Sequence, residues 1–186
     1  MTTINFKSDK TGAQEIAEGS DQRLNVSSRT DSRRYYMSRD FSDAYSAVWD
    51  DASSAANDEI FYLKNTDANG RALVVSAIGL NSEQACSFKL HLVTGTVASG
   101  TTVTPVCLNR QTVKAAAATC EEAAGTALTG LTSAGVVDHA SVVADGHEEF
   151  RLDDTLRLGQ EDAISIEYEQ GTTGRTWGVV FFYYED

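Results

Sequence analysis

Short runs in which apolar and polar residues alternate recur through most of this sequence, with turn-forming residues between them. The clearest runs are residues 59–65, 86–95 and 163–169. A period of two places the apolar side chains on one face, which is the pattern of a half-buried β-strand. Roughly eight such runs predict an all-β chain that folds as a two-sheet antiparallel sandwich. A jelly roll of two Greek keys is the first choice, and an immunoglobulin-like sandwich is the second.

The distribution of charge divides the chain into an N-terminal arm, residues 1–40, and a sandwich domain, residues 41–186. The formal net charge of the 186-residue chain is −12, yet the arm holds seven basic and six acidic side chains. We expect this arm to be extended or partly ordered. Its arginines either stay solvated or hold the carboxylates of an acidic neighbour in their planar guanidinium groups. The candidates for partner binding are Arg23, Arg29, Arg33, Arg34 and Arg39.

The last predicted strand, residues 177–184, is apolar on both faces. A sandwich strand normally has one solvated face, and monomers rarely expose large apolar patches. We predict that Val180, Phe182 and Tyr184 lie on the outer face, where a second copy of the chain covers them. Cover from a loop or from the arm of the same chain is the alternative.

Several local patterns predict particular elements. Asn69 and Gly70 stand between two apolar runs and predict a β-hairpin, because both residue types tolerate positive φ. Pro105, the only proline, indicates an edge strand or a bulge, since proline has no amide proton to donate. Residues 113–124 are rich in alanine, but we favour strand over helix there because a spaced apolar stripe is missing. The aromatic-rich residues 33–38 predict a further strand.

The residues that most often carry chemistry are scattered. His91, His139 and His147 lack a compact metal-binding spacing. The carboxylate pairs at 50–51 and 153–154 have the composition that glycosidases need, but a solvated acidic face explains them better. We therefore predict no metal, no cofactor and no catalytic residue, and hence no enzymatic activity.

The cysteines and the net charge restrict the environment and the partners. Cys86, Cys107 and Cys120 are too few and too irregular for a disulfide framework. We expect reduced thiols packed in the core, with a Cys107–Cys120 disulfide as the alternative. The acidic charge predicts neither nucleic acid nor membrane as a partner, because both are negatively charged. No apolar run approaches the ~20 residues of a membrane helix, and the start of the chain shows no secretion signal.

One segment, GTVASGTTVTPVCLNRQTVKAAAAT at residues 95–119, resembles a pattern found in virion structural proteins of tailed bacteriophages. The residues that carry this resemblance are Gly100, Thr101, Val103, Pro105, Val106, Leu108, Asn109 and Arg110. The later runs DTLRLGQEDAISIEYEQ and VVFFYYED extend the resemblance over residues 58–186, without the arm.

The resemblance implies a non-enzymatic decoration, or cement, protein of jelly-roll type that binds the outside of an assembled capsid. Such a protein is made in the host cytoplasm and ends on the capsid surface of the virion. Its partners would be the major capsid protein or another virion protein, together with further copies of itself in a dimer or trimer. The alternative is a receptor- or glycan-binding module of a tail, neck or fibre. A small cupin-type enzyme is a more distant rival.

Overall fold

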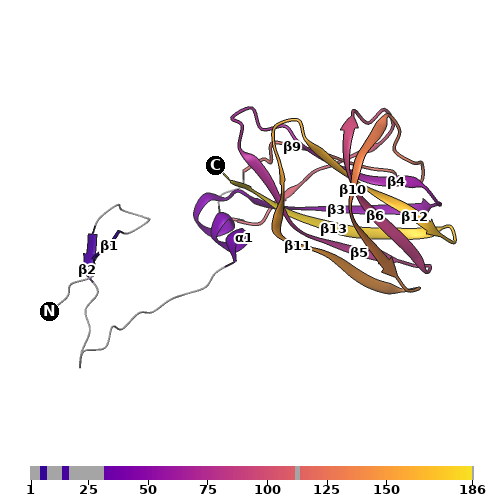
Figure 1. The fold of residues 1–186 in the computed structure, drawn as a ribbon, viewed down its shortest axis with the longest axis horizontal. Coiled ribbons are helices and arrows are strands. Elements are labelled where there is room, and N and C mark those ends of the chain that lie inside the picture. Colours follow the sequence, from indigo (N-terminus) through magenta and orange to yellow (C-terminus); the bar gives the residue numbers. More distant parts are fainter. Residues whose placement is uncertain (1–4, 8–13, 17–31, 112–113, 186) are drawn as a thin grey trace, which may run out of the picture. The chain divides into compact units, whose positions relative to one another are not determined.

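The structure is a computed structural model of the chain (Figure 1). The residues that it describes are 5–7, 14–16, 32–111 and 114–185. They belong to two compact units, Met1–Asp31 and Ser32–Asp186. In the first unit, β1 (Asn5–Lys7) pairs antiparallel with β2 (Gln14–Ile16).

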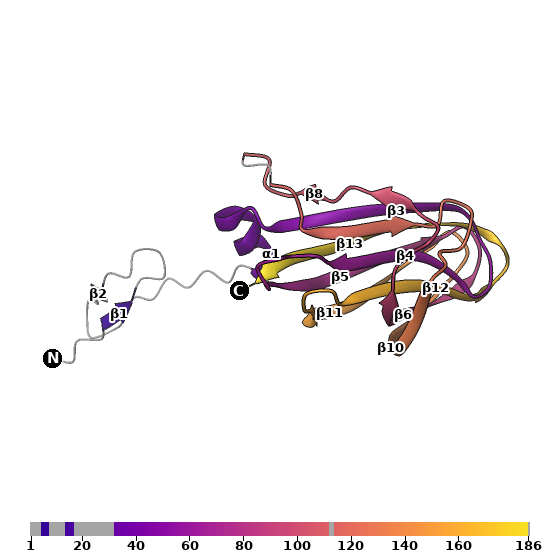
Figure 2. The same cartoon turned by 90° about the horizontal axis from the view of Figure 1, so that it is seen from above.

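The second unit is built from strands in two antiparallel sheets. The strands are β3 (Ala44–Ser54), β4 (Asp58–Asn65), β5 (Ala72–Ser82), β6 (Cys86–Gly95), β7 (Thr101–Val103), β8 (Val106–Cys107), β9 (Ala118–Glu122), β10 (Leu131–Val142), β11 (Gly146–Leu158), β12 (Ala163–Gly171) and β13 (Gly174–Glu185). One sheet has the order β11-β5-β13-β3-β8, and the other has the order β10-β6-β12-β4-β9-β7. The sheets stack as two layers around one core, so the predicted sandwich is confirmed (Figure 2).

The order of the eight long strands is that of a jelly roll. These strands, lettered B to I in chain order, are β3, β4, β5, β6, β10, β11, β12 and β13. They form a B-I-D-G sheet and a C-H-E-F sheet, which we call the BIDG and CHEF sheets. Consecutive long strands change sheet at every connection except the one from β6 to β10. The last two strands therefore lie in opposite sheets, as the jelly-roll prediction requires.

The connection from β6 to β10 extends the edges of both sheets at β3 and β4. β9 pairs with β4 and β7 pairs with β9, so both lengthen the CHEF sheet. β8 pairs with β3 and lengthens the BIDG sheet. Pro105 stands between β7 and β8, where the chain passes from one sheet to the other. The proline therefore marks an edge, as expected, and β9 confirms strand rather than helix in the alanine-rich segment.

Aromatic rings join the two layers. Trp49 of β3 lies next to Phe61 of β4, with ring centroids 6.3 Å apart, and both side chains are fully buried. Burying one such side chain contributes roughly 1.5–3 kcal/mol. Gly178 of β13 leaves room for the indole, because a Cβ at this position would lie 2.6 Å from a ring carbon of Trp49.

The apolar residues Val180, Phe182 and Tyr184 of β13 belong to this core and do not form an outer surface. Their exposed fractions are 0%, 0% and 1%. Phe182 stacks on Tyr45 of the neighbouring strand β3, with centroids 5.5 Å apart. The prediction that these three residues offer a contact to a second copy is wrong, because the opposite face of the strand points outward.

The residues before β3 are helical, in place of the strand expected there. α1 (Arg33–Tyr36) is capped by the Ser32 side chain and leads into a π-helical turn, Met37–Phe41. Met37 packs against Tyr183 in a small second apolar cluster, so this segment belongs to the sandwich unit. The unit therefore begins earlier than expected. Within the described part of the chain, no helix has both the length and the apolar character needed to span a bilayer.

The turn at Asn69 and Gly70 does not close a hairpin, because β4 and β5 belong to different sheets. Gly70 has the expected positive φ, +76°. The carboxylate of Asp67 holds the turn by accepting hydrogen bonds from the Asn69 amide at 2.7 Å and from Arg71 Nε at 2.6 Å. Burial opposes ionisation of this carboxyl, but these hydrogen bonds outweigh it and lower the pKa of Asp67 below its ordinary value.

Candidate functional site

The outer face of the BIDG sheet carries apolar side chains where a sandwich usually carries polar ones. The residues of this surface, which we call the BIDG face, are Val48, Val106, Trp177, Val179 and Phe181. Val48 of β3 pairs with Val179 of β13. Two residues earlier on β3, Ser46 pairs with Phe181 of β13 on one side and with Val106 of β8 on the other. Val48 is 64% exposed and Val106 is 49% exposed. The face is therefore contiguous and open to a partner.

Two arginines frame the BIDG face. The guanidinium of Arg34 lies 4.4 Å from the ring centroid of Phe181, and that of Arg175 lies 5.4 Å from the ring centroid of Trp177. Arg175 also donates two hydrogen bonds to the carboxylate of Asp50, at 2.8 and 2.5 Å. The guanidinium groups cover the aromatic rings by cation–π contact. The exposed valines between them stay uncovered, which leaves an aliphatic centre between charged ends.

The predicted arm arginines that the structure describes contact their own domain. Arg33 Nη2 lies 2.8 Å from Glu185 Oε1, at the end of the sandwich where α1 and the C-terminus are close together (Figure 1). Arg34 contacts β13, and Arg39 Nε donates to Asp40 at 2.9 Å. These three arginines stabilise the domain, and their role toward a partner stays a prediction. The candidates that lie outside the described residues are Arg23 and Arg29.

The carboxylate pair at 50–51 does not converge on one point. Asp50 points outward to Arg175, whereas Asp51 is buried and accepts hydrogen bonds from Ser54 Oγ and from the Gly125 amide, each at 2.5 Å. Neighbouring residues of a strand face opposite sides, so this pair cannot flank one glycosidic bond. Asp51 instead ties the β6–β10 connection to β3.

The three cysteines are buried as thiols and are not joined by disulfides, as the sequence led us to expect. Cys107 of β8 and Cys120 of β9 lie in different sheets. Burial raises the pKa of the Cys120 thiol to about 12 and also raises the pKa of Cys86. Both thiols therefore stay protonated and unreactive at neutral pH.

The carboxylate pair at 153–154 includes a side chain outside the described residues.

The three histidines lie apart, on β6, β10 and β11. His147 Nδ1 is 3.0 Å from Asn81 Oδ1 on the BIDG sheet, and His139 Nδ1 is 3.6 Å from a carboxylate oxygen of Glu169. His91 is different, because it lies beside two carboxylates from neighbouring strands. No spacing of histidines and carboxylates along the chain indicates this grouping.

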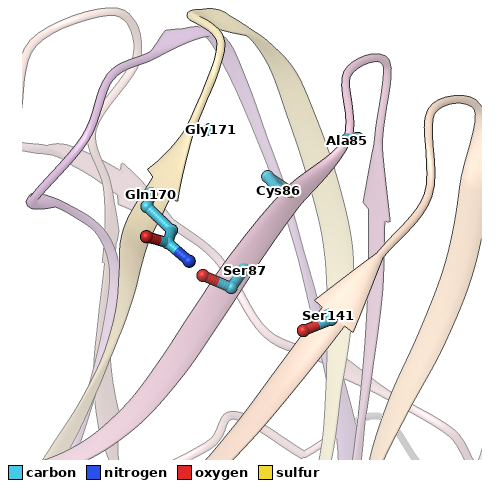
Figure 3. Close-up of a pocket in the computed structure, with 6 residues that line it drawn as sticks. All are labelled: Ala85, Cys86, Ser87, Ser141, Gln170 and Gly171. Atoms are coloured by element: carbon cyan, nitrogen blue, oxygen red, sulfur yellow. The ribbon is translucent and has the colours of Figure 1, made fainter.

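A depression of about 410 Å³ opens where β6, β10 and β12 lie side by side at one end of the CHEF sheet (Figure 3). Its lining residues are Ala85, Cys86, Ser87, Ser141, Gln170 and Gly171. The amide of Gln170 points toward the hydroxyl of Ser87, and Ser141 lies next to them on β10 (Figure 3). The lining contains no aromatic ring, so it lacks the stacking surface on which sugar-binding sites usually depend.

Comparisons with protein-family models, curated proteins and solved structures found no match to this chain. Functional inference therefore rests on the fold and on the surface. Sequence reasoning missed the outward valine of β3, although Val48 falls on the same face as the polar Ser46 and Asp50. It also missed the valine of β8, because that residue becomes part of the face only through pairing with β3.

Proposed function

We propose that this chain is a non-enzymatic virion structural protein that binds the outside of a phage capsid, as a decoration protein does. The observation that carries the proposal is a complete jelly roll with an uncovered aliphatic face. Jelly rolls occur in viral capsids, lectins and cupins, so the fold alone restricts the function to several classes. The resemblance of residues 95–119 to virion proteins favours the first class.

The described interior argues against a cupin-type enzyme. Such an enzyme gathers histidines and a carboxylate inside its barrel around a metal. Here rings such as Trp49, Phe61 and Phe182 fill the space between the sheets. His139 and His147 are exposed, outside that space.

A glycan-binding module of a tail or fibre is the second candidate. Its recognition site would present an exposed aromatic ring to the sugar. The depression on the CHEF sheet has no such ring, and Trp177 lies under Arg175. The capsid-binding function therefore has more support than this alternative.

The BIDG face is the surface that we assign to self-association. Two copies related by a two-fold axis would bring the same face together, because such an interface uses one patch on both subunits. Contact between these faces would remove the exposed valines from water, and a stable interface of this kind buries about 1,600 Å² in total. The arm, through Arg23 and Arg29, would then contact an acidic surface of the capsid protein.

Light scattering on the full-length protein tests the self-association surface. The wild type should have the mass of a dimer, and Val48→Glu should be a monomer, because a carboxylate would be buried without a partner. Val143→Glu is the matched control, since Val143 is 73% exposed in the turn between β10 and β11, away from the BIDG face. A monomeric wild type, or equal dissociation of both variants, would contradict the assignment.

Removal of residues 1–31 tests the contribution of the arm. The truncated chain keeps the whole sandwich unit, which begins at Ser32. We expect it to stay folded and to lose binding to purified capsids in a sedimentation assay. Wild-type occupancy of the truncated chain on capsids would show that the arm is not the attachment.

A further inference from the structure

Three metal-binding side chains meet on the outer face of the CHEF sheet, on the layer opposite the BIDG face. Glu59, His91 and Glu167 come from the neighbouring strands β4, β6 and β12. Glu167 pairs with Glu59, and His91 lies opposite Ser165, two residues before Glu167. The intervening Ile166 points into the core, so its neighbours face outward. One ligand atom of each of the three side chains lies within 4.8 Å of the others.

Polar atoms at this place are buried without hydrogen-bond partners. Among the described residues, such atoms include Glu59 Oε2 and His91 Nε2, and the Ser165 hydroxyl beside them interacts with the Glu59 carboxylate. His91 is 5% exposed and Ser165 is 0% exposed. His91 Nε2 lies 2.8 Å from Glu167 Oε2, so the two side chains form an ion pair when the imidazole is protonated. Buried polar atoms without a hydrogen-bond partner destabilise a fold, so the convergence of these side chains indicates that a ligand belongs between them.

A neighbouring serine orients the imidazole for metal binding. His91 Nδ1 lies 2.7 Å from Ser133 Oγ on β10. When Nδ1 carries the proton and donates it to this hydroxyl, Nε2 keeps its lone pair and directs it toward the two carboxylates. Histidines that bind metals usually have their second ring nitrogen held by such a hydrogen bond.

The charges around the cluster also favour a cation. Lys89 Nζ lies 3.0 Å from Glu169 and 3.6 Å from Glu167, so its charge is shared between two carboxylates. The Glu59 carboxylate forms no ion pair with any described lysine or arginine, although it lies in the same cluster. A bound divalent ion would compensate the negative charge that the lysine leaves unbalanced.

The geometry points to a divalent transition-metal site formed by Glu59, His91 and Glu167, with Zn²⁺ as the preferred ion. One imidazole nitrogen and two carboxylate oxygens are a donor set that zinc accepts. Ligand atoms about 2.1 Å from an ion are at most about 4.2 Å apart, so the cluster needs to close by no more than roughly half an ångström. The ion would join β4, β12 and β6 at one point and so stabilise the CHEF sheet.

Zinc titration of the full-length protein tests this site. The protein is dialysed against a chelator, and ZnCl₂ alone is then added while bound metal is measured by calorimetry and the unfolding midpoint by a thermal melt. We expect one equivalent of zinc to bind and the midpoint to rise until that equivalent is added. Millimolar Mg²⁺ should produce no such rise, because this ion prefers oxygen ligands and keeps most of its water.

Variants separate the proposed site from unspecific binding to an acidic protein. His91→Gln should abolish the stoichiometric binding, and Ser133→Ala should weaken it roughly 10- to 100-fold through loss of the orienting hydrogen bond. His139→Gln is the control, because His139 lies on the same sheet but contacts Glu169 outside the cluster. The metal-dependent shift is compared within each variant, so a change in basal stability does not affect the result. Absence of stoichiometric zinc in the wild type, or equal affinity in His91→Gln, would overturn the proposal.

Discussion

Replacement of Gly178 by alanine should destabilise the sandwich strongly, because β13 has no room for a methyl group at this position. The added Cβ would lie 2.3 Å from the carbonyl oxygen of Gly79 and 2.6 Å from the indole of Trp49. Gly79 belongs to the paired strand β5, and Trp49 is fully buried against Phe61. Neither neighbour can withdraw without breaking strand pairing or core packing.

The expected loss follows from this overpacking. An extra methyl group in a packed core typically costs 1–3 kcal/mol, and the backbone contact places Gly178→Ala at the upper end, about 3 kcal/mol. For a chain of this size, 1 kcal/mol shifts the thermal midpoint by roughly 2–4 °C, so the midpoint should fall by about 6–12 °C. Differential scanning calorimetry and urea unfolding measure both quantities.

Gly135→Ala is the matched control for this experiment. Gly135 also lies within a strand, β10, but a Cβ there would have no atom within 4 Å and its φ is not positive. We expect unchanged stability or a gain of a few tenths of a kcal/mol, because alanine restricts the unfolded chain. Wild-type stability of Gly178→Ala, or equal losses in both variants, would refute the packing argument.

Three further predictions concern buried polar groups. Asp51→Ala should cost roughly 2–4 kcal/mol in urea unfolding, because it removes the charge-assisted hydrogen bonds from Ser54 and Gly125. Asp50→Ala loses only an exposed ion pair with Arg175 and should cost about 0–1 kcal/mol, so equal losses in the two variants would contradict this contrast. The folded pKa of Asp67 lies below the ordinary 3.8, so its ionised form stabilises the fold above that pH and this contribution is lost as pH falls through the folded pKa. Asp67→Asn should therefore lower the urea midpoint at pH 7 and flatten its decline in acid, and an unchanged acid decline would refute the role of this carboxylate. The three buried thiols should not react with Ellman's reagent in native buffer, and all three should react in denaturant. Rapid reaction of any of them in the native state would contradict their burial.

The fold class was predictable because a period of two is a local property. Strands such as β6 and β12 carry their core residues at every second position, and this alternation is visible without any knowledge of partners. The connections were less predictable. The Asn69-Gly70 turn has the chemistry of a hairpin, but strand order decides whether a turn joins neighbours in one sheet or crosses between sheets.

The faces of β13 could not be assigned from its sequence, because both alternating sets are apolar. The register settles the question, since Gly178 and Val180 face the core next to Trp49 while Val179 pairs with Val48 on the outside. A strand with one polar face would have removed this ambiguity.

The polar cluster on the CHEF sheet was equally hidden from sequence reasoning. Its ligands, Glu59, His91 and Glu167, come from segments far apart in the chain, and none of them lies in a metal-binding motif. Only the order β6-β12-β4 brings them together. Clusters of this kind become visible when the strand order and the burial of each side chain are both known.

Electron cryomicroscopy of phage particles assembled in the presence of this protein would test the proposed capsid-binding function most directly. A capsid-binding function predicts jelly-roll density on the outside of the capsid shell, with the BIDG face against a second copy and the CHEF face turned away from that contact. Density for the chain at the tail tip alone, or its absence from intact particles, would contradict a capsid-binding function.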